Sequence, residues 1–378
     1  MNRIITLALL GGILLLNACS KDNNQVPSSY AEFYNVNYSG QTDRLNMLAE
    51  MTAEMKNSNS GGTVDGQKLI DMYRNENTPF ADASLNTSTK QLANKTYSVG
   101  GDAWTNTTFE YMMGYLASIS AQAGNTWAPN QAGVATSGSK AYFFDAYGVE
   151  YTQLIEKGLM GAVFYYQMAE TYTRDGKIGN GVDNETVEPG KGTDMEHHWD
   201  EAFGYFGAPI DLTAANFAAY LSSGDARYHA KYAGKGNDVG LNTVDKMMDQ
   251  FIKGRHGIST KDYTARDEAA AQLRVEWEMV IATTAIHYIN STINNFSDDA
   301  LRGHALSEAY AFIISLYYNS DRSITDAQLS TIRGYLEFTP PGSPTSVPNF
   351  LNVTTADLNT IKDQLSSIYG LDSVKDQL

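Results

Sequence analysis

Apolar residues recur at α-helical spacing over nearly the whole chain, and this pattern limits the possible folds more than any other feature. No run of alternating apolar and polar residues indicates a sheet. We therefore predict an all-α fold built as packed helical bundles. Helices are expected over residues 44–55, 66–73, 107–122, 148–172, from 193 onward, 213–222, 242–253, 262–293, 298–318, 325–336 and 355–369.

The chain beyond residue 30 is long enough for one large domain, residues 31–378, or for two bundles at about 31–223 and 240–378. Residues 175–192 form a polar loop of Gly, Asn and Asp, which we interpret as solvated because it lacks the spacing of a calcium-binding loop. Residues 339–348 are rich in proline and predict a stiff linker before the last helix.

The N-terminus reads MNRIITLALLGGILLLNAC, in which one Arg precedes an apolar run that is too short to span a membrane. Residues 1–18 are predicted to be a secretory signal peptide, and Leu-Asn-Ala-Cys resembles the site where lipoproteins are cleaved and acylated. Cys19 is the single cysteine of the chain. We expect acylated Cys19 to attach the protein to outer-membrane lipid through a tether, residues 19–30. The sequence leaves open whether the domain faces the periplasm or the cell surface.

The formal net charge of −16 and a pI of about 4.7 argue against nucleic acid as a partner, because an acidic surface repels phosphates. The same charge is compatible with binding a cation. Tyrosine is abundant, with 24 residues, and suits contacts with a sugar or a porphyrin as well as packing between helices.

The stretch TDMEHHWDEAFGYFG, residues 193–207, holds two of the six histidines side by side. Thr193 followed three residues later by Glu196 is a capping box, which predicts a helix start and gives Glu196 a structural role. At about 100° per residue, Trp199 and Phe203 face the core, while His198 lies at the border between the apolar and the polar side.

His197, Asp200 and Glu201 fall on the wetter side of this helix. His198 and Glu201 are three residues apart, so their side chains can meet. They could bind Zn or Fe together, the carboxylate could orient the imidazole and raise its pKa, or the pair could satisfy itself at a helix interface. The zinc-protease pattern H-E-x-x-H is absent, and the inverse pattern H-x-x-E-H fails because Ala202 rather than a histidine follows Glu201.

Two later helices supply further candidate ligands. His304 and Glu308 are one turn apart on a stripe of small and polar residues that must meet water or other polar groups. Glu276 interrupts a helix that is apolar nearly all round, whereas Glu278 can be satisfied by Arg274.

We hypothesise that the helices with these candidates converge into one metal site of nitrogen and oxygen ligands, His198, Glu201, Glu276, His304 and Glu308. The remaining histidines in loop-like, basic, glycine-rich surroundings, His229 and His256, are expected at the surface.

HHWDEAFGYFG, followed later by GHALSEAYAFI, resembles the imelysin-like proteins, and more narrowly an uncharacterised family of bacterial lipoproteins grouped with them. The likeness covers about residues 148–318. His198 and Glu201 match the family motif Gly-x-His-x-x-Glu, but Glu196 stands where the motif has Gly. The resemblance implies two helical bundles related by duplication and a cell-envelope role in iron or haem acquisition. It also implies a peptidase activity that was proposed for the family.

Three functions remain open at this point. The first is a lipid-anchored binding protein that captures iron, haem or zinc for an outer-membrane transporter. The second is a metallopeptidase, which needs a third ligand and a general base that the sequence does not show. The third is a glycan-binding or structural surface lipoprotein, which predicts an exposed aromatic platform. We favour binding without catalysis.

Overall fold

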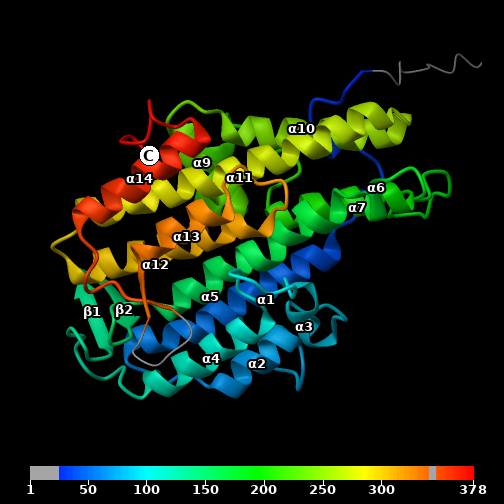
Figure 1. The fold of residues 1–378 in the computed structure, drawn as a ribbon. Coiled ribbons are helices and arrows are strands. Elements are labelled where there is room, and N and C mark those ends of the chain that lie inside the picture. The colour runs from blue at the N-terminus through cyan, green and yellow to red at the C-terminus, as the bar shows by residue number, and fades with distance from the viewer. Residues whose placement is uncertain (1–24, 340–345) are drawn as a thin grey trace, which may run out of the picture.

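The computed structural model describes residues 25–339 and 346–378. The predicted signal peptide, Cys19, the tether up to residue 24 and most of the linker lie outside these residues. Within them the prediction of an all-α fold is confirmed, since fourteen α-helices and two small hairpins make up the regular structure (Figure 1). The helices are α1 (Ser39–Met55), α2 (Gly66–Arg74), α3 (Ala83–Thr87), α4 (Asn106–Ser120), α5 (Tyr151–Leu159), α6 (Asp175–Ile178), α7 (Asp194–Phe206), α8 (Phe217–Ser223), α9 (Tyr228–Asp238), α10 (Thr243–Thr260), α11 (Tyr263–Asn294), α12 (Asp299–Ser315), α13 (Asp326–Gly334) and α14 (Thr355–Tyr369).

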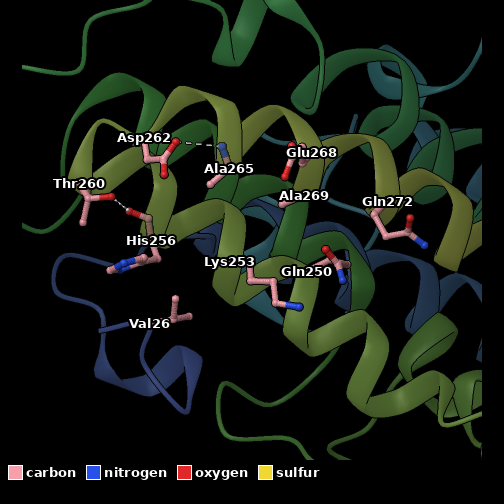
Figure 2. Close-up of a pocket in the computed structure, with 10 residues that line it drawn as sticks. All are labelled: Val26, Gln250, Lys253, His256, Thr260, Asp262, Ala265, Glu268, Ala269 and Gln272. Carbon is pink, nitrogen blue, oxygen red and sulfur yellow. Dashed lines mark hydrogen bonds between the residues drawn. The ribbon is translucent and has the colours of Figure 1, made fainter. Parts of the chain in front are cut away.

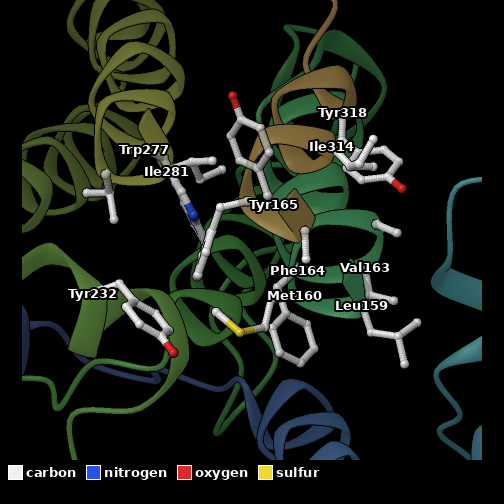
Figure 3. Close-up of a cluster of buried hydrophobic side chains, with 14 of the residues drawn as sticks. Leu159, Met160, Val163, Phe164, Tyr165, Tyr232, Trp277, Ile281, Ile314 and Tyr318 are labelled. Atoms are coloured by element: carbon white, nitrogen blue, oxygen red, sulfur yellow. The ribbon is translucent and has the colours of Figure 1, made fainter. Parts of the chain in front are cut away.

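Helix α11 organises the fold. Its 32 residues give a length of about 48 Å, and it packs against α9, α10, α12 and α14. Trp277, at its middle, is fully buried beside Tyr165 in the hydrophobic cluster of Figure 3. Most of the buried apolar residues form one continuous cluster, which extends from Tyr30 to Leu378. The division into two bundles stays a prediction. None of the helices in the described ranges is long and apolar enough to cross a membrane.

The helix predicted over residues 148–172 contains two π-helical segments. Helix α5 continues into η4 (Met160–Tyr165) and then η5 (Met168–Tyr172). Gly161 lies directly against Ser315 of α12, and a Cβ added there would collide with that side chain. A residue without a side chain at this position therefore allows the two helices to approach closely. The π turns also change which residues of the last turns face the neighbouring helices.

The expectation of no sheet was wrong in two short places. β1 (Gly133–Ser137) and β2 (Lys140–Phe144) form an antiparallel hairpin between the helices predicted at 107–122 and 148–172, and β3 (Glu337–Phe338) pairs with β4 (Val347–Pro348). Five residues are too few to show a clear alternation. The hairpin forms because Gly138 adopts a left-handed φ of 57° at its turn and Phe143 is buried.

The expectation that His229 lies at the surface in a loop was wrong, and His256 lies in a helix rather than a loop, although it keeps part of its surface exposed. His229 lies on α9 and is fully buried, whereas His256 lies on α10 and is half-buried. Helix α9 was missed because Gly234 and Gly236 look like helix breakers. In the structure these glycines let Phe217 and Thr243 approach the helix closely.

Candidate functional site

The predicted capping box at the start of α7 is confirmed. The Glu196 backbone N–H donates to Thr193 Oγ1 at 3.2 Å, and the Thr193 backbone N–H donates to Glu196 Oε2 at 3.0 Å. Glu196 also forms an ion pair with Arg255 of α10. Glu196 therefore has the structural role that the sequence indicated.

Asp200 is fully buried, which corrects its predicted place on the wetter side of α7. The N-terminal segment covers it, because Tyr30 Oη donates to Asp200 Oδ1 at 2.6 Å and the Asn37 backbone N–H donates to Oδ2 at 3.2 Å. Arg255 Nε lies 3.0 Å from Oδ1. Burial raises the pKa of Asp200 to about 6, although Arg255 acts in the opposite direction.

Both ring nitrogens of His198 are held by Lys177. Nδ1 lies 2.8 Å from the Lys177 carbonyl oxygen and Nε2 lies 3.2 Å from Lys177 Nζ. The ammonium can only donate and the carbonyl can only accept, so Nδ1 carries the proton and Nε2 accepts. Burial lowers the pKa of His198, and the Lys177 charge lowers it further, although the carbonyl bond opposes both. His198 is therefore neutral at pH 7.

Glu201 has other partners than the predicted one. Its Oε1 accepts from Gln41 Nε2 at 3.0 Å and from Tyr172 Oη at 3.3 Å. In the part of the chain that the structure describes, no hydrogen bond or ion pair joins Glu201 to His198. Tyr172 ends η5, so a π turn positions the group that contacts Glu201.

His304 and Glu308 do meet, as predicted, and they form the centre of a larger cluster. His304 Nδ1 lies 2.6 Å from Glu150 Oε2, and His304 Nε2 lies 3.7 Å from Glu308 Oε2. The other oxygen of Glu308, Oε1, lies 3.3 Å from Lys157 Nζ, which is 3.0 Å from Glu156. The polar stripe of α12 therefore meets polar groups, as its composition required.

The surroundings of His304 favour its charged form. Glu150 is fully buried, and the His304 side chain is 23% exposed under a stacked Tyr142 ring at 4.0 Å. Burial alone would lower the pKa of His304, but the carboxylates of Glu150 and Glu308 outweigh it and raise that pKa above its ordinary value.

The sequence analysis missed Glu150, Lys157 and Tyr142. Glu150 occupies the N-cap position of α5 without a side-chain capping bond, and nothing in the sequence paired it with His304.

Glu276 and Glu278 of α11 have partners outside this cluster. Glu276 is half-buried and accepts from Gln272 Nε2, one turn earlier on the same helix, at 2.8 Å. Glu278 is buried and accepts from Tyr369 Oη at 2.7 Å and from the Ser323 backbone N–H at 2.8 Å. Its predicted partner was wrong, because Arg274 instead pairs with Asp321 at 3.0 Å.

The five predicted ligands therefore have separate sets of partners, with His304 and Glu308 as the pair that the structure brings together. Within residues 25–339 and 346–378, no group of three or more His, Cys, Asp or Glu side chains is placed to hold a metal ion. Metal binding at these residues stays a prediction.

A polar groove of about 610 Å³ runs between α10 and α11, beside Val26 of the N-terminal segment (Figure 2). His256 and Lys253 lie along one wall, and Glu268 and Gln272 along the other. None of the five predicted ligands lines it.

Residues 32–371 match the family described as a domain of unknown function, DUF4856, so the chain belongs to that family. No curated protein matches the chain. No solved structure matches it either.

Proposed function

We propose that this chain is a lipid-anchored binding protein of the cell envelope that takes up chelated iron, with haem as the first candidate, at His304 and Glu308. The main support for this proposal is the contact of 2.6 Å between His304 Nδ1 and Glu150, because it leaves His304 Nε2 directed toward Glu308. A histidine that ligates a metal commonly donates its other ring N–H to a carboxylate in this way.

The donor atoms fit a metal in type and in spacing. Two ligands that each lie about 2.1 Å from one ion are separated by about 3.0 to 4.2 Å, depending on the angle between them. His304 Nε2 and Glu308 Oε2 are 3.7 Å apart. Lys157 contacts the other oxygen of Glu308, so Oε2 is the atom that would face the metal.

Two protein donors favour a metal that brings ligands of its own. Haem supplies four nitrogen ligands to its iron and needs only axial ones from the protein, and a ferric chelate likewise carries part of its coordination sphere. A zinc ion held by protein alone usually takes three or four side chains. In a ferric chelate, His304 would supply nitrogen and Glu308 oxygen to the same iron. In haem, two donors 3.7 Å apart cannot lie on opposite faces of the ring, so His304 would ligate the iron and Glu308 would supply negative charge beside it. In either case His304 Nε2 would have to release its proton on binding.

Two parts of the proposal, the location in the cell envelope and the outer-membrane transporter as partner, are supported by the sequence alone. The lipobox-like residues up to Cys19 support attachment to outer-membrane lipid. The resemblance of the His198–Glu201 motif to imelysin-like proteins supports a role in iron handling, with an outer-membrane transporter as the receiving partner.

The test is a titration of haem, a ferric chelate and Zn²⁺ into the soluble form that begins at Ser20. We expect saturable binding of haem or the chelate, weakened at least about tenfold in His304→Ala and in Glu308→Gln. His198→Ala is the matched control, because it removes a histidine side chain outside the proposed site, and it should bind as tightly as the wild type. Equal binding by His304→Ala and wild type would refute the site.

Glycan binding is a second candidate function, because an aromatic platform is exposed on α4. The Tyr111 side chain is 65% exposed, and its ring lies parallel to that of Tyr115 at 6.2 Å. Binding of the wild type, but not Tyr111→Ala, to an oligosaccharide on an array would support it. No signal above background would exclude it.

A further inference from the structure

Four cations gather around Lys95 and Tyr172, beside Glu201 of α7. We call this group, Arg44, Lys90, Lys95 and Lys177, the basic cluster. Lys95 Nζ lies 3.3 Å from Tyr172 Oη and 5.4 Å from the ring centre, and Lys177 Nζ lies 5.8 Å from the same ring centre. The charges of Arg44, Lys90 and Lys177 all act on Lys95.

The basic cluster lacks carboxylate partners, although the chain carries a net charge of −16. In the described part of the chain, none of its four side chains forms an ion pair. Buried Arg44 donates to the backbone carbonyls of Gln91 at 2.9 Å and Gly40 at 3.2 Å. Its contacts are thus with neutral oxygens, which leave the guanidinium charge uncompensated.

Glu201 is the carboxylate whose charge acts on Lys95, and it accepts its hydrogen bonds from neutral groups. Four cations against this one carboxylate leave the group with a formal charge of +3. Burial and the neighbouring cations together hold the pKa of Lys95 below its ordinary value. A half-buried surface with this excess of positive charge stabilises an added anion more strongly than open solvent does.

The backbone conformation at Tyr172 is a second observation, independent of the charges. Tyr172 is the last residue of the π-helical segment η5, and π turns inside α-helices occur frequently at functional sites. The turn places the Tyr172 hydroxyl between Lys95 and Glu201. A hydroxyl donor beside two ammonium groups is a suitable set of contacts for an oxyanion.

We propose that the basic cluster binds a small oxyanion, a carboxylate or a phosphate group, with Lys95 and Lys177 as its charged contacts and Tyr172 as a hydroxyl donor. Glu201 competes with the ligand, because the Tyr172 hydroxyl now donates to it. The site goes beyond the proposed function, since it shares no residue with the cluster at His304.

The test is calorimetric titration of the soluble form with inorganic phosphate and, separately, with succinate, in chloride buffer at constant ionic strength. We expect saturable binding in at least one arm, and the stronger arm identifies which oxyanion the site takes. Lys95→Gln and Lys177→Gln should each weaken it at least about tenfold. Lys261→Gln, the matched control, removes an equal charge from an exposed pair with Glu185 and should leave the affinity unchanged.

The Glu201→Gln variant distinguishes an oxyanion site from a metal site by the direction in which the affinity changes. It should tighten oxyanion binding several-fold, because it removes the competing charge and keeps an acceptor for Tyr172. A metal site at the same residues would require the opposite, a loss of binding. The absence of binding to both anions, weaker binding by Glu201→Gln, or equal losses in Lys261→Gln and Lys177→Gln would each overturn the proposal. Circular dichroism spectra of every variant separate loss of binding from loss of fold.

Discussion

Replacing His304 by leucine tests the energetic role of the His304–Glu150 pair. Glu150 is fully buried, and among the described residues its carboxylate otherwise accepts a single hydrogen bond, a long one of 3.4 Å from Gln153 Nε2. Two charges about 4 Å apart interact by about 4 kcal/mol at an effective dielectric constant of about 20. Removal of one member of a buried pair typically costs about 3–5 kcal/mol. We therefore expect His304→Leu to lower the free energy of unfolding by about 3–5 kcal/mol at pH 6.

The double variant His304→Leu/Glu150→Gln should recover about 2 kcal/mol of that loss, because the neutral amide does not need a cation. Urea unfolding of the wild type, His304→Leu, Glu150→Gln and the double variant, followed by circular dichroism, measures the cycle. A loss below about 1 kcal/mol in His304→Leu, or no recovery in the double variant, would refute the argument that the pair is charged and buried.

The same pair predicts a dependence on pH. The pKa of His304 is raised above its ordinary value of 6.5 in the folded protein. The stability that it contributes is therefore complete below pH 6.5 and is lost as the pH rises through the folded pKa. Wild-type stability should fall above pH 6.5, and His304→Gln should remove this part of the slope.

Three other substitutions have defined outcomes. The pKa of Asp200 is raised from 3.8 to about 6 in the folded protein, which corresponds to about 3 kcal/mol of stability that is present below pH 4 and lost as the pH rises through 6. Asp200→Asn should therefore flatten the dependence of the unfolding free energy on pH between about pH 4 and 6, as measured by urea unfolding across this range. Gly161→Ala should lower the unfolding free energy by about 1–3 kcal/mol through its collision with Ser315, visible as a lower Tm. His229→Leu should raise the Tm or leave it unchanged, because neither ring nitrogen has a hydrogen-bond partner among the described residues; a large decrease would show that the imidazole has a partner.

Local sequence patterns predicted the helices well. The capping box of Thr193 and Glu196 and the long helix α11 both follow from interactions within a few residues, so one sequence is enough to show them. The hairpin around Gly138 and helix α9 were missed, because short strands and glycine-rich helices depend on tertiary packing for their stability.

The candidate site was predictable only in part. His304 and Glu308 are one turn apart on α12, so helical geometry brings them together. Glu150 lies 154 residues away in the sequence, and only the packing of α5 against α12 places it at His304. For the same reason the sequence could not show that Lys177, and not Glu201, holds both nitrogens of His198.

Haem titration of the soluble form, followed by absorbance in wild type, His304→Ala and His198→Ala, tests the central claim most directly. We expect saturable binding in the wild type and in His198→Ala, and binding weakened at least about tenfold in His304→Ala. No binding by the wild type, or identical binding by all three proteins, would contradict a haem site at His304 and Glu308.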